Sequence, residues 1–183
     1  MPDAADKLTP EKRFDYAVNV VLTNEGGYSD DIDDPGGETN FGITQSDLND
    51  CAKVLNLPTE VNNLTSDDAK RLYRVMYWDK YHYEAINSLA IATKVFDLAV
   101  NIGAHQAHIL AQRACNWCGH NLEVDGILGG KTIGALNEIT LHNREEDLKG
   151  ELINEQKWFY EHLVEEKPTL KVFLKGWLKR AEW

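Results

Sequence analysis

A single glutamate stands directly before two glycines in the stretch NEGGYSDDIDDPGGETNFGIT, residues 24–44. It is followed by an acidic turn that contains Asp30, Asp31, Asp33 and Asp34. Two carboxyl groups in different environments can split a glycosidic bond, because one donates a proton while the other acts as a base, a nucleophile or an electrostatic partner. The stretch therefore predicts a glycosidase site in which Glu25 works with a carboxylate of the turn.

The helix expected before Glu25 explains how these carboxyl groups would differ. Thr9 is a candidate N-cap and Pro10 suits the first helical position. Apolar residues then recur with helical spacing at Phe14, Ala17, Val18, Val21 and Leu22. We expect the helix to end at Gly26 and Gly27. Glu25 would lie at the negative end of the helix dipole beside an apolar face, and both effects favour the protonated form that a general acid needs.

Other residues of the stretch would shape a cleft for substrate. Tyr28 can form one wall, and Gly36 and Gly37 would let the backbone approach a bulky ligand closely. The alternative is that Glu25 is an exposed helix-end residue and the aspartates form a solvated turn or bind calcium. The run lacks the glycine and the terminal glutamate of an EF-hand loop, which argues against calcium.

Composition restricts the class of protein. A chain of 183 residues, 43% apolar and 27% charged, is long enough for one domain or two small ones. The net charge of -11 argues against a nucleic-acid partner. No apolar run approaches the roughly 20 residues of a membrane span, and no signal peptide is recognisable. We expect a monomer made in the cytoplasm, without membrane insertion, that acts in the periplasm or outside only after release or export.

A CxxC pair suggests a metal site. Cys115 and Cys118, with His108 and His120 nearby, have the types of four zinc ligands. Alternatively, both cysteines are small buried side chains on one helix. The second interpretation is favoured because the segment is helix-like, whereas metal-site spacings usually come with tight turns. No metal or organic cofactor is therefore predicted.

The remaining pattern predicts a mostly α-helical chain with at most a small β-hairpin beside the opening motif. A second short strand is expected within TNFGIT, residues 39–44. Further helices are expected over 64–81 with a cap at Thr65 or Ser66, over 88–119 with a break near Gly103, near Thr132 as the cap of a short helix, and over 144–166 and 169–181, separated by Pro168.

Aromatic residues of the 64–81 segment and beyond are candidates for stacking on sugar rings: Tyr77, Trp78, Tyr81 and Tyr83. For Trp78, core packing is the favoured alternative, because the helical pattern points it inward together with Leu72, Val75 and Met76. Asn101 follows an apolar helix and would either reach a substrate amide or cap the helix.

Several other polar or aromatic residues are expected to have a structural role and no role in a site. We expect surface positions for His82, His105 and His108, which have no partner visible in the sequence. Trp177 and Arg180 are expected to provide packing and an ion pair on the last helix.

The opening motif resembles that of the lysozyme-like muramidases of glycoside hydrolase family 108, which is roughly E-G-G-Y, an Asp-rich turn and then D-P-G-G-x-T-x-x-G-I. Further segments continue the resemblance from about Thr9 to Arg180: YWDKYHYEAI, VFDLAVNIGAHQA, DGILGGKTIGAL and FLKGWLKRAEW. The third is similar to the signature of the associated peptidoglycan-binding domain. Members degrade peptidoglycan and are often phage or prophage endolysins or parts of bacterial protein export.

The resemblance implies a lysozyme-like catalytic part over residues 9–101 and a helical peptidoglycan-binding part over 102–183 packed against it. It implies cleavage of the β-1,4 bond between N-acetylmuramic acid and N-acetylglucosamine, with Glu25 protonating the leaving oxygen. Asp34 and Thr39 match the pattern of phage-type lysozymes and would hold the attacking water.

Two departures from the family pattern leave alternatives open. Asp31-Ile32 stands where many members carry Asp-Pro, so the other aspartates of the turn remain candidates for the second role. Gly129-Gly130-Lys131-Thr132 replaces the usual Gly-Pro-Lys-Thr and implies a more flexible wall-binding loop. A lytic transglycosylase and a non-catalytic wall-binding or secretion-accessory protein are the alternative functions.

Overall fold

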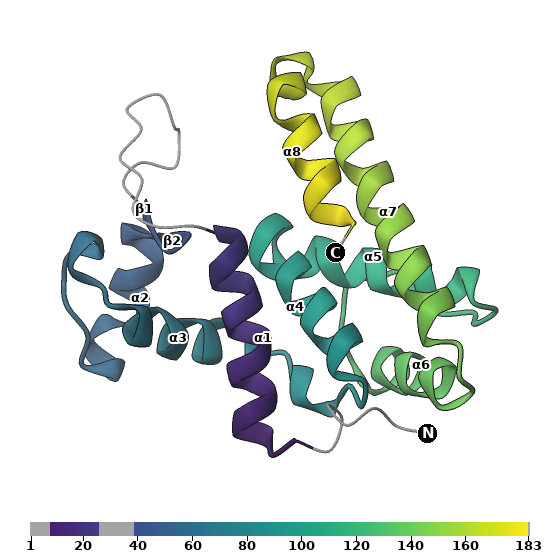
Figure 1. The fold of residues 1–183 in the computed structure, drawn as a ribbon, viewed down its shortest axis with the longest axis horizontal. Coiled ribbons are helices and arrows are strands. Elements are labelled where there is room, and N and C mark those ends of the chain that lie inside the picture. The colour runs from purple at the N-terminus through teal and green to yellow at the C-terminus, as the bar shows by residue number, and fades with distance from the viewer. Residues whose placement is uncertain (1–7, 26–38, 183) are drawn as a thin grey trace. The chain divides into compact units, whose positions relative to one another are not determined.

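The computed structural model describes residues 8–25 and 39–182, which are mostly helical and include one small β-hairpin, as expected (Figure 1). The chain divides into two compact units, residues 1–84 and residues 85–183. Within the described ranges, no helix combines the length and the hydropathy needed to cross a bilayer.

Helix α1 (Pro10–Glu25) begins where the sequence predicts. The backbone N–H of Lys12 donates to the Thr9 hydroxyl over 3.4 Å, and Pro10 occupies the first helical position. Four of the five predicted apolar residues are buried: Phe14, Ala17, Val18 and Val21. This face fixes the helix against its unit and places Glu25 at the last helical position.

A two-residue turn joins strands β1 (Thr39–Asn40) and β2 (Ile43–Thr44), which pair antiparallel. Its central residues, Phe41 and Gly42, both have positive φ values, 54° and 74°. This combination is typical of the hairpin turns whose twist suits neighbouring strands. The amide of the buried Asn40 donates to the carbonyls of Val61 and Leu64, and thereby anchors the hairpin to the loop around η2 (Val61–Asn63).

Helix α2 (Gln45–Leu55) is absent from the sequence-based prediction. A capping box starts it: the Thr44 hydroxyl accepts from the Asp47 N–H, and the Asp47 carboxylate accepts from the Thr44 N–H. Leu48 and Ala52 are then buried with i,i+4 spacing. The Thr-x-x-Asp pattern could have revealed this helix from sequence.

Helix α3 (Ser66–Tyr73) passes directly into a π-type turn, η3 (Arg74–Trp78), and the expectation that Val75 points inward is wrong. Val75 is 42% exposed, whereas Tyr73 and Trp78 are buried. The wider turn brings residues five apart onto one face. The inward face therefore continues from Tyr73 to Trp78 instead of through Val75.

Helices α4 (Leu89–Ile102) and α5 (Ala104–Trp117) follow the predicted segment, with the break at Gly103. Gly103 has φ 86°, a conformation that glycine adopts readily. Helix α5 lies at the centre of the second unit and packs against α4, α6 (Gly130–Leu141) and α7 (Glu145–Glu166) (Figure 1).

Helix α6 begins at Gly130, two residues before Thr132, near which the sequence predicts its cap. Thr132 lies within the first turn, where its buried hydroxyl donates to the Ile127 carbonyl over 3.2 Å. The helix starts earlier because the glycine-rich turn supplies its N-cap residue, Gly129, without a side-chain cap.

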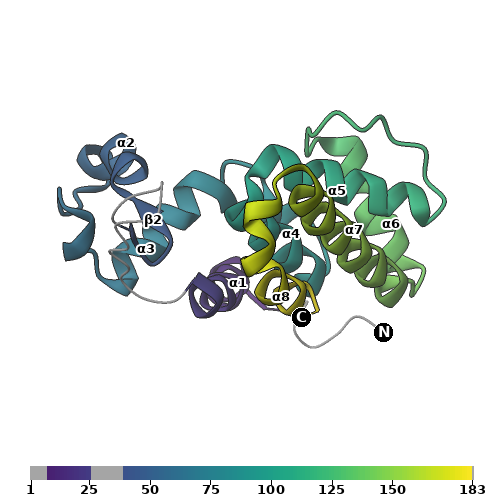
Figure 2. The same ribbon diagram turned by 90° about the horizontal axis from the view of Figure 1, so that it is seen from above.

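Helix α8 (Lys171–Ala181) follows the short turn η5 (Pro168–Leu170) and lies side by side with α7 (Figure 2). The predicted ion pair of Arg180 is confirmed: its guanidinium lies 2.8 Å from the fully buried carboxylate of Asp97 on α4. The Lys94 ammonium donates to the Ala181 carbonyl over 2.8 Å. These contacts fasten the end of α8 to α4.

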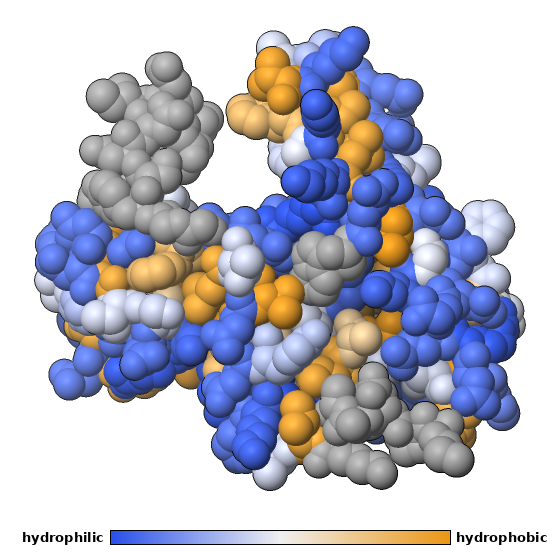
Figure 3. All heavy atoms as spheres, in the orientation of Figure 1, coloured by the Kyte–Doolittle hydropathy of each residue, from blue (hydrophilic) through white to orange (hydrophobic). Residues whose placement is uncertain are grey.

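The α7–α8 pair also exposes apolar side chains. Figure 3 shows hydrophobic atoms gathered over these two helices, and Val172 and Phe173 on α8 are 79% and 54% exposed. Trp177 has the predicted packing role, because its ring lies 5.3 Å from that of Tyr160 and 5.8 Å from that of Phe173.

Candidate active site and wall-binding loop

The carboxylate of Glu25 lies against the turn of the β-hairpin. A Cβ atom added at Gly42 would lie 2.6 Å from Oε2 of Glu25, so the absence of a side chain at Gly42 makes room for the carboxylate. Glu25 itself is half-buried at the end of α1. The hairpin thus forms one side of the immediate surroundings of Glu25.

Tyr73 joins the same site from the end of α3. Its hydroxyl donates to the Phe41 carbonyl over 2.7 Å and lies 3.0 Å from the position of an added Cβ at Gly42. The bond holds the turn from the side of α3. Glu25, Gly42 and Tyr73 therefore meet at one point although they come from three different elements.

Tyr77 adds a phenol one helical turn after Tyr73. Burial raises the pKa of Tyr77 to about 12, and the nearby charges of Asp47 and Glu25 act in the same direction. The Tyr77 hydroxyl therefore stays protonated at neutral pH and can donate a hydrogen bond. Its ring lies 6.1 Å from that of Tyr73 and 6.5 Å from that of Tyr81, which makes a row of three tyrosines.

The other predicted site residues differ in where they lie: one is near Glu25, one is in the core, and four are outside the described residues. Thr39 lies on β1 opposite Thr44, on the hairpin whose turn contacts Glu25. Trp78 is 1% exposed and packs edge-on against Phe14 at 5.7 Å, which fits the core-packing interpretation. Four predicted site residues lie outside the described residues: Tyr28, Asp34, Gly36 and Gly37.

Asn101 belongs to the second unit and is not the helix cap, because α4 continues past it to Ile102. Its side-chain oxygen accepts from the Tyr160 hydroxyl over 2.5 Å. That hydroxyl in turn accepts from the buried Gln156 amide over 2.8 Å. Asn101 thus takes part in a polar contact between α4 and α7.

Two residues of the site escaped the sequence-based reasoning. The sequence predicts Gly42 only as part of a strand-like segment and as the last glycine of the family motif, and Tyr73 only as a helical residue. The i, i+4, i+8 spacing of Tyr73, Tyr77 and Tyr81 could have indicated a continuous aromatic row. No local pattern indicates that Gly42 would face Glu25, because that contact joins separate elements.

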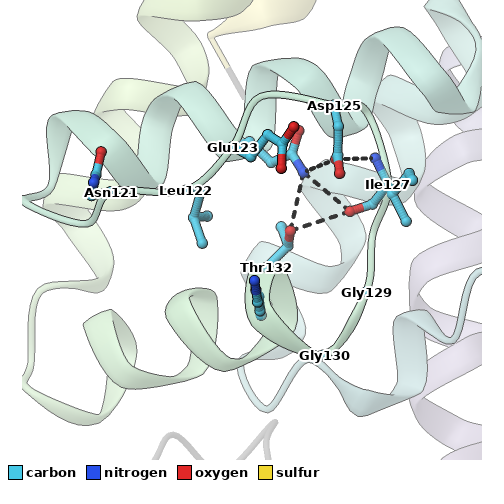
Figure 4. A pocket seen from close by; sticks show the side chains of 10 residues that line it. Asn121, Leu122, Glu123, Asp125, Ile127, Gly129, Gly130 and Thr132 are labelled. Carbon is cyan, nitrogen blue, oxygen red and sulfur yellow. Dashed lines mark hydrogen bonds between the residues drawn. The ribbon is translucent and has the colours of Figure 1, made fainter.

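A second candidate site is the glycine-rich loop before α6, which lines a pocket of about 260 Å³ (Figure 4). The buried Gln112 organises it: its amide donates to Asp125, to the Ile127 carbonyl and to Thr132, and its oxygen accepts from the Gly126 N–H. Gly129, Gly130 and Lys131 line the mouth together with residues 121–123. Gln112 of α5 thus bonds to several points of the loop before α6.

The expectation that His108 lies on the surface is wrong. Its side chain is 1% exposed, and Nδ1 lies 3.2 Å from the Gly126 carbonyl, so the neutral ring donates from Nδ1. Burial lowers the pKa of His108 to about 4, although the bond to Gly126 acts in the opposite direction. The bond from His108 to the Gly126 carbonyl fastens the loop to α5.

The four residues considered as zinc ligands are not gathered into a metal site. Among all residues that the structure describes, no group of three or more His, Cys, Asp or Glu side chains is placed to hold a metal ion. Cys115 and Cys118 are both buried, and burial raises the pKa of Cys115 to about 12. Cys115 therefore stays a thiol near neutral pH and packs as a small apolar side chain.

Comparisons with known proteins match the two halves of the chain to two different families. A family model described as glycosyl hydrolase 108 matches residues 14–103, and one described as a predicted peptidoglycan domain matches residues 106–182. The solved structure of SagA from Brucella abortus is 27% identical, with a TM-score of 0.72, and the match covers 93% of this chain and 90% of that one. The comparison with curated proteins found no match.

Helix α4 explains why the family models and the compact units divide the chain differently. The models meet between residues 103 and 106, whereas the units meet between Glu84 and Ala85. Helix α4 falls within the first model but packs against α5 in the second unit. The domain boundary predicted between residues 101 and 102 stays a prediction.

Proposed function

Because the chain belongs to the glycosyl hydrolase 108 family and is a lysozyme-type glycoside hydrolase, we propose that it cleaves the β-1,4 bond between N-acetylmuramic acid and N-acetylglucosamine. The predicted peptidoglycan domain that follows the hydrolase part supports peptidoglycan as the substrate of the whole chain. The protein is then a peptidoglycan hydrolase whose two parts cut and hold the same polymer.

The contact of Glu25 with the hairpin turn is the observation that carries this proposal. A general acid must be held at one place beside the scissile bond. Helix α1 fixes the backbone of Glu25, and Gly42 leaves room for its carboxylate. Glu25 is therefore the proposed donor of the proton to the leaving glycosidic oxygen.

The tyrosine hydroxyl groups around Glu25 are proposed to position the site and the substrate, and they take no part in the proton transfer. Tyr73 holds the hairpin turn through the Phe41 carbonyl. Tyr77, whose hydroxyl remains protonated, is a proposed hydrogen-bond donor to a sugar oxygen or an acetamido carbonyl. The row formed by Tyr73, Tyr77 and Tyr81 offers aromatic surface on which a sugar ring can pack.

Asp34 and Thr39 are proposed to hold the attacking water, on the basis of the sequence pattern alone. If the turn supplies no such partner, Glu25 would instead support a lytic transglycosylase, in which a hydroxyl group of the sugar attacks in place of water. Both reactions begin with protonation of the same oxygen, so the two candidates differ in their products.

Product analysis on purified sacculi tests the proposal. We expect wild-type protein to release fragments with reducing N-acetylmuramic acid ends, which mass spectrometry distinguishes from anhydro ends. Anhydro ends would indicate that the protein is a lytic transglycosylase and not a hydrolase. Reducing N-acetylglucosamine ends would place the cut at the other glycosidic bond, and no release of fragments would contradict an enzymatic role.

A further inference from the structure

An exposed tryptophan at the end of α5 is held in place by a buried carboxylate. Trp117 is 71% exposed, yet its indole N–H donates to Oε1 of Glu155 on α7 over 2.8 Å. Glu155 is only 5% exposed. The bond to Glu155 fixes the orientation of this exposed indole ring.

The same carboxylate holds a cation beside the indole. Oε2 of Glu155 lies 2.8 Å from Nε of Arg113, which stands one turn before Trp117 on α5. The guanidinium lies over the Trp158 ring at 4.2 Å, and that ring stacks on His162 at 5.0 Å. Arg113 is thus held by an ion pair and by an aromatic face.

The two helices supply these residues with regular spacing. Arg113 and Trp117 are i,i+4 on α5, while Glu155, Trp158 and His162 are i, i+3, i+7 on α7. Helices α5 and α7 pack against each other in the second unit. The cluster of Arg113, Trp117, Glu155, Trp158 and His162, called the indole platform below, is therefore built by rigid elements.

We propose that the indole platform binds a glycan strand of peptidoglycan, with one sugar ring stacked on Trp117. The inference rests on the proposed function, because it takes the substrate from there. The apolar face of a sugar packs well on a fixed aromatic ring, and little entropy is lost when that ring is already held. The structure records no further polar partner for the guanidinium of Arg113 among the described residues, which leaves its remaining N–H groups for acetamido or carboxylate oxygens of the strand.

The loop before α6 is a poorer candidate for this contact. Gln112 of α5, the side chain at the centre of this pocket's hydrogen bonds, already bonds to Asp125, Ile127, Thr132 and Gly126. The pocket also offers no aromatic ring among the lining residues. The surface formed by α5 and α7 is therefore the better candidate for stacking on a sugar ring.

Binding to insoluble sacculi separates this inference from catalysis. The full-length chain with Glu25→Gln is sedimented with purified sacculi, alone and combined with Trp117→Ala or Phe173→Ala. Phe173 is the matched control, since it is also an exposed aromatic residue of this unit but has no polar group by which a carboxylate could hold it. We expect Trp117→Ala to weaken binding about tenfold, the size of one good stacking contact, and Phe173→Ala to leave it unchanged.

Two further variants test how the platform works. Glu155→Ala removes the group that orients Trp117 and Arg113, and it should weaken binding less than Trp117→Ala, because the indole is still present. Trp117→Phe keeps a ring but loses the hydrogen bond to Glu155, and it should restore part of the affinity. Circular dichroism and the melting temperature of each variant establish that it is folded.

Unchanged sedimentation of folded Trp117→Ala would overturn the inference and leave the proposed function intact. Equal losses with Phe173→Ala would also overturn it, because binding would then depend on exposed aromatic area in general. If Glu25→Gln alone still releases fragments from sacculi, the catalytic proposal fails while the binding comparison keeps its meaning. If the wild-type chain neither binds nor cuts sacculi, both fail.

Discussion

Gly42 and Glu25 face each other so closely that a Cβ atom on Gly42 would lie 2.6 Å from the Glu25 carboxylate oxygen. Such a distance is too short for any real contact between these atoms. The hairpin turn and the end of α1 are thus shaped to fit one another, with glycine as the residue that leaves the carboxylate its place.

Gly42→Ala should strongly reduce hydrolysis of sacculi. The added methyl group pushes the Glu25 carboxylate away, and the φ of 74° also disfavours alanine at this position. Because a small displacement of a catalytic group costs about a hundredfold in rate, we expect a loss of at least about tenfold. Turbidity loss of a sacculus suspension measures it.

Gly150→Ala is the matched control for this substitution. Gly150 lies within α7, and an added Cβ would meet no atom within 4 Å. Alanine should stabilise the helix by roughly 0.5–1 kcal/mol and leave the rate unchanged. Equal rates for folded Gly42→Ala and Gly150→Ala would show that the turn does not position the catalytic carboxylate.

Glu25→Gln should lower the rate by at least about a hundredfold, the low end for the loss of a general acid. Glutamine keeps the shape of the side chain but has no proton to transfer. Asp15→Asn is the control, because Asp15 is an exposed carboxylate on the same helix. Folded Asp15→Asn should keep the wild-type rate of sacculus hydrolysis. Near-normal lysis by folded Glu25→Gln would contradict the assignment.

Tyr73→Phe should slow hydrolysis more mildly, by several-fold. The variant keeps the ring but loses the hydrogen bond to the Phe41 carbonyl, which holds the turn. The rate of sacculus hydrolysis measures this loss, and it should stay well above that of Glu25→Gln, because the Glu25 carboxyl group is unchanged. A variant that is folded but as inactive as Glu25→Gln would indicate that Tyr73 takes part in the chemistry itself.

The second unit should lose stability in acid through His108. Its pKa is about 4 in the folded chain and near 6.5 when unfolded, so the unfolded chain binds more protons between these values. The stabilisation is present above about pH 6.5 and is lost as the pH falls towards 4, by about 3 kcal/mol in total. Denaturant unfolding at a series of pH values measures this loss.

His108→Asn should flatten that dependence, since asparagine can still donate a hydrogen bond but does not titrate in this range. His142→Asn, at an exposed histidine, should keep the wild-type slope. Identical slopes for both variants would assign the acid sensitivity to other groups.

The local sequence by itself determined most of the helices and the position of Glu25 at the end of the first one. The apolar spacing of α1 fixes which face is buried, and Thr9 and Pro10 fix where the helix begins. Glu25 follows as the last residue of that helix. These features depend on contacts within a few residues of one another, which is why their pattern can be recognised in the sequence.

Residues take positions that differ from their local pattern where the helix geometry changes or where a distant segment covers them. Val75 points outward because a π-type turn shifts the inward face to Trp78. His108 is buried because the loop before α6 returns over α5 and offers it the Gly126 carbonyl. Neither feature can be predicted from the spacing of apolar residues in the sequence.

The site itself was decided only by tertiary structure. Sequence alone singles out Glu25, but the meeting of Glu25, Gly42 and Tyr73 depends on how α1, the hairpin and the end of α3 pack together. Likewise, Trp117 and Glu155 come together only because α5 and α7 lie against each other. Periodicity specifies which face of an element is buried, whereas the partner that covers that face is selected by the shapes and polar groups of residues far away in the chain.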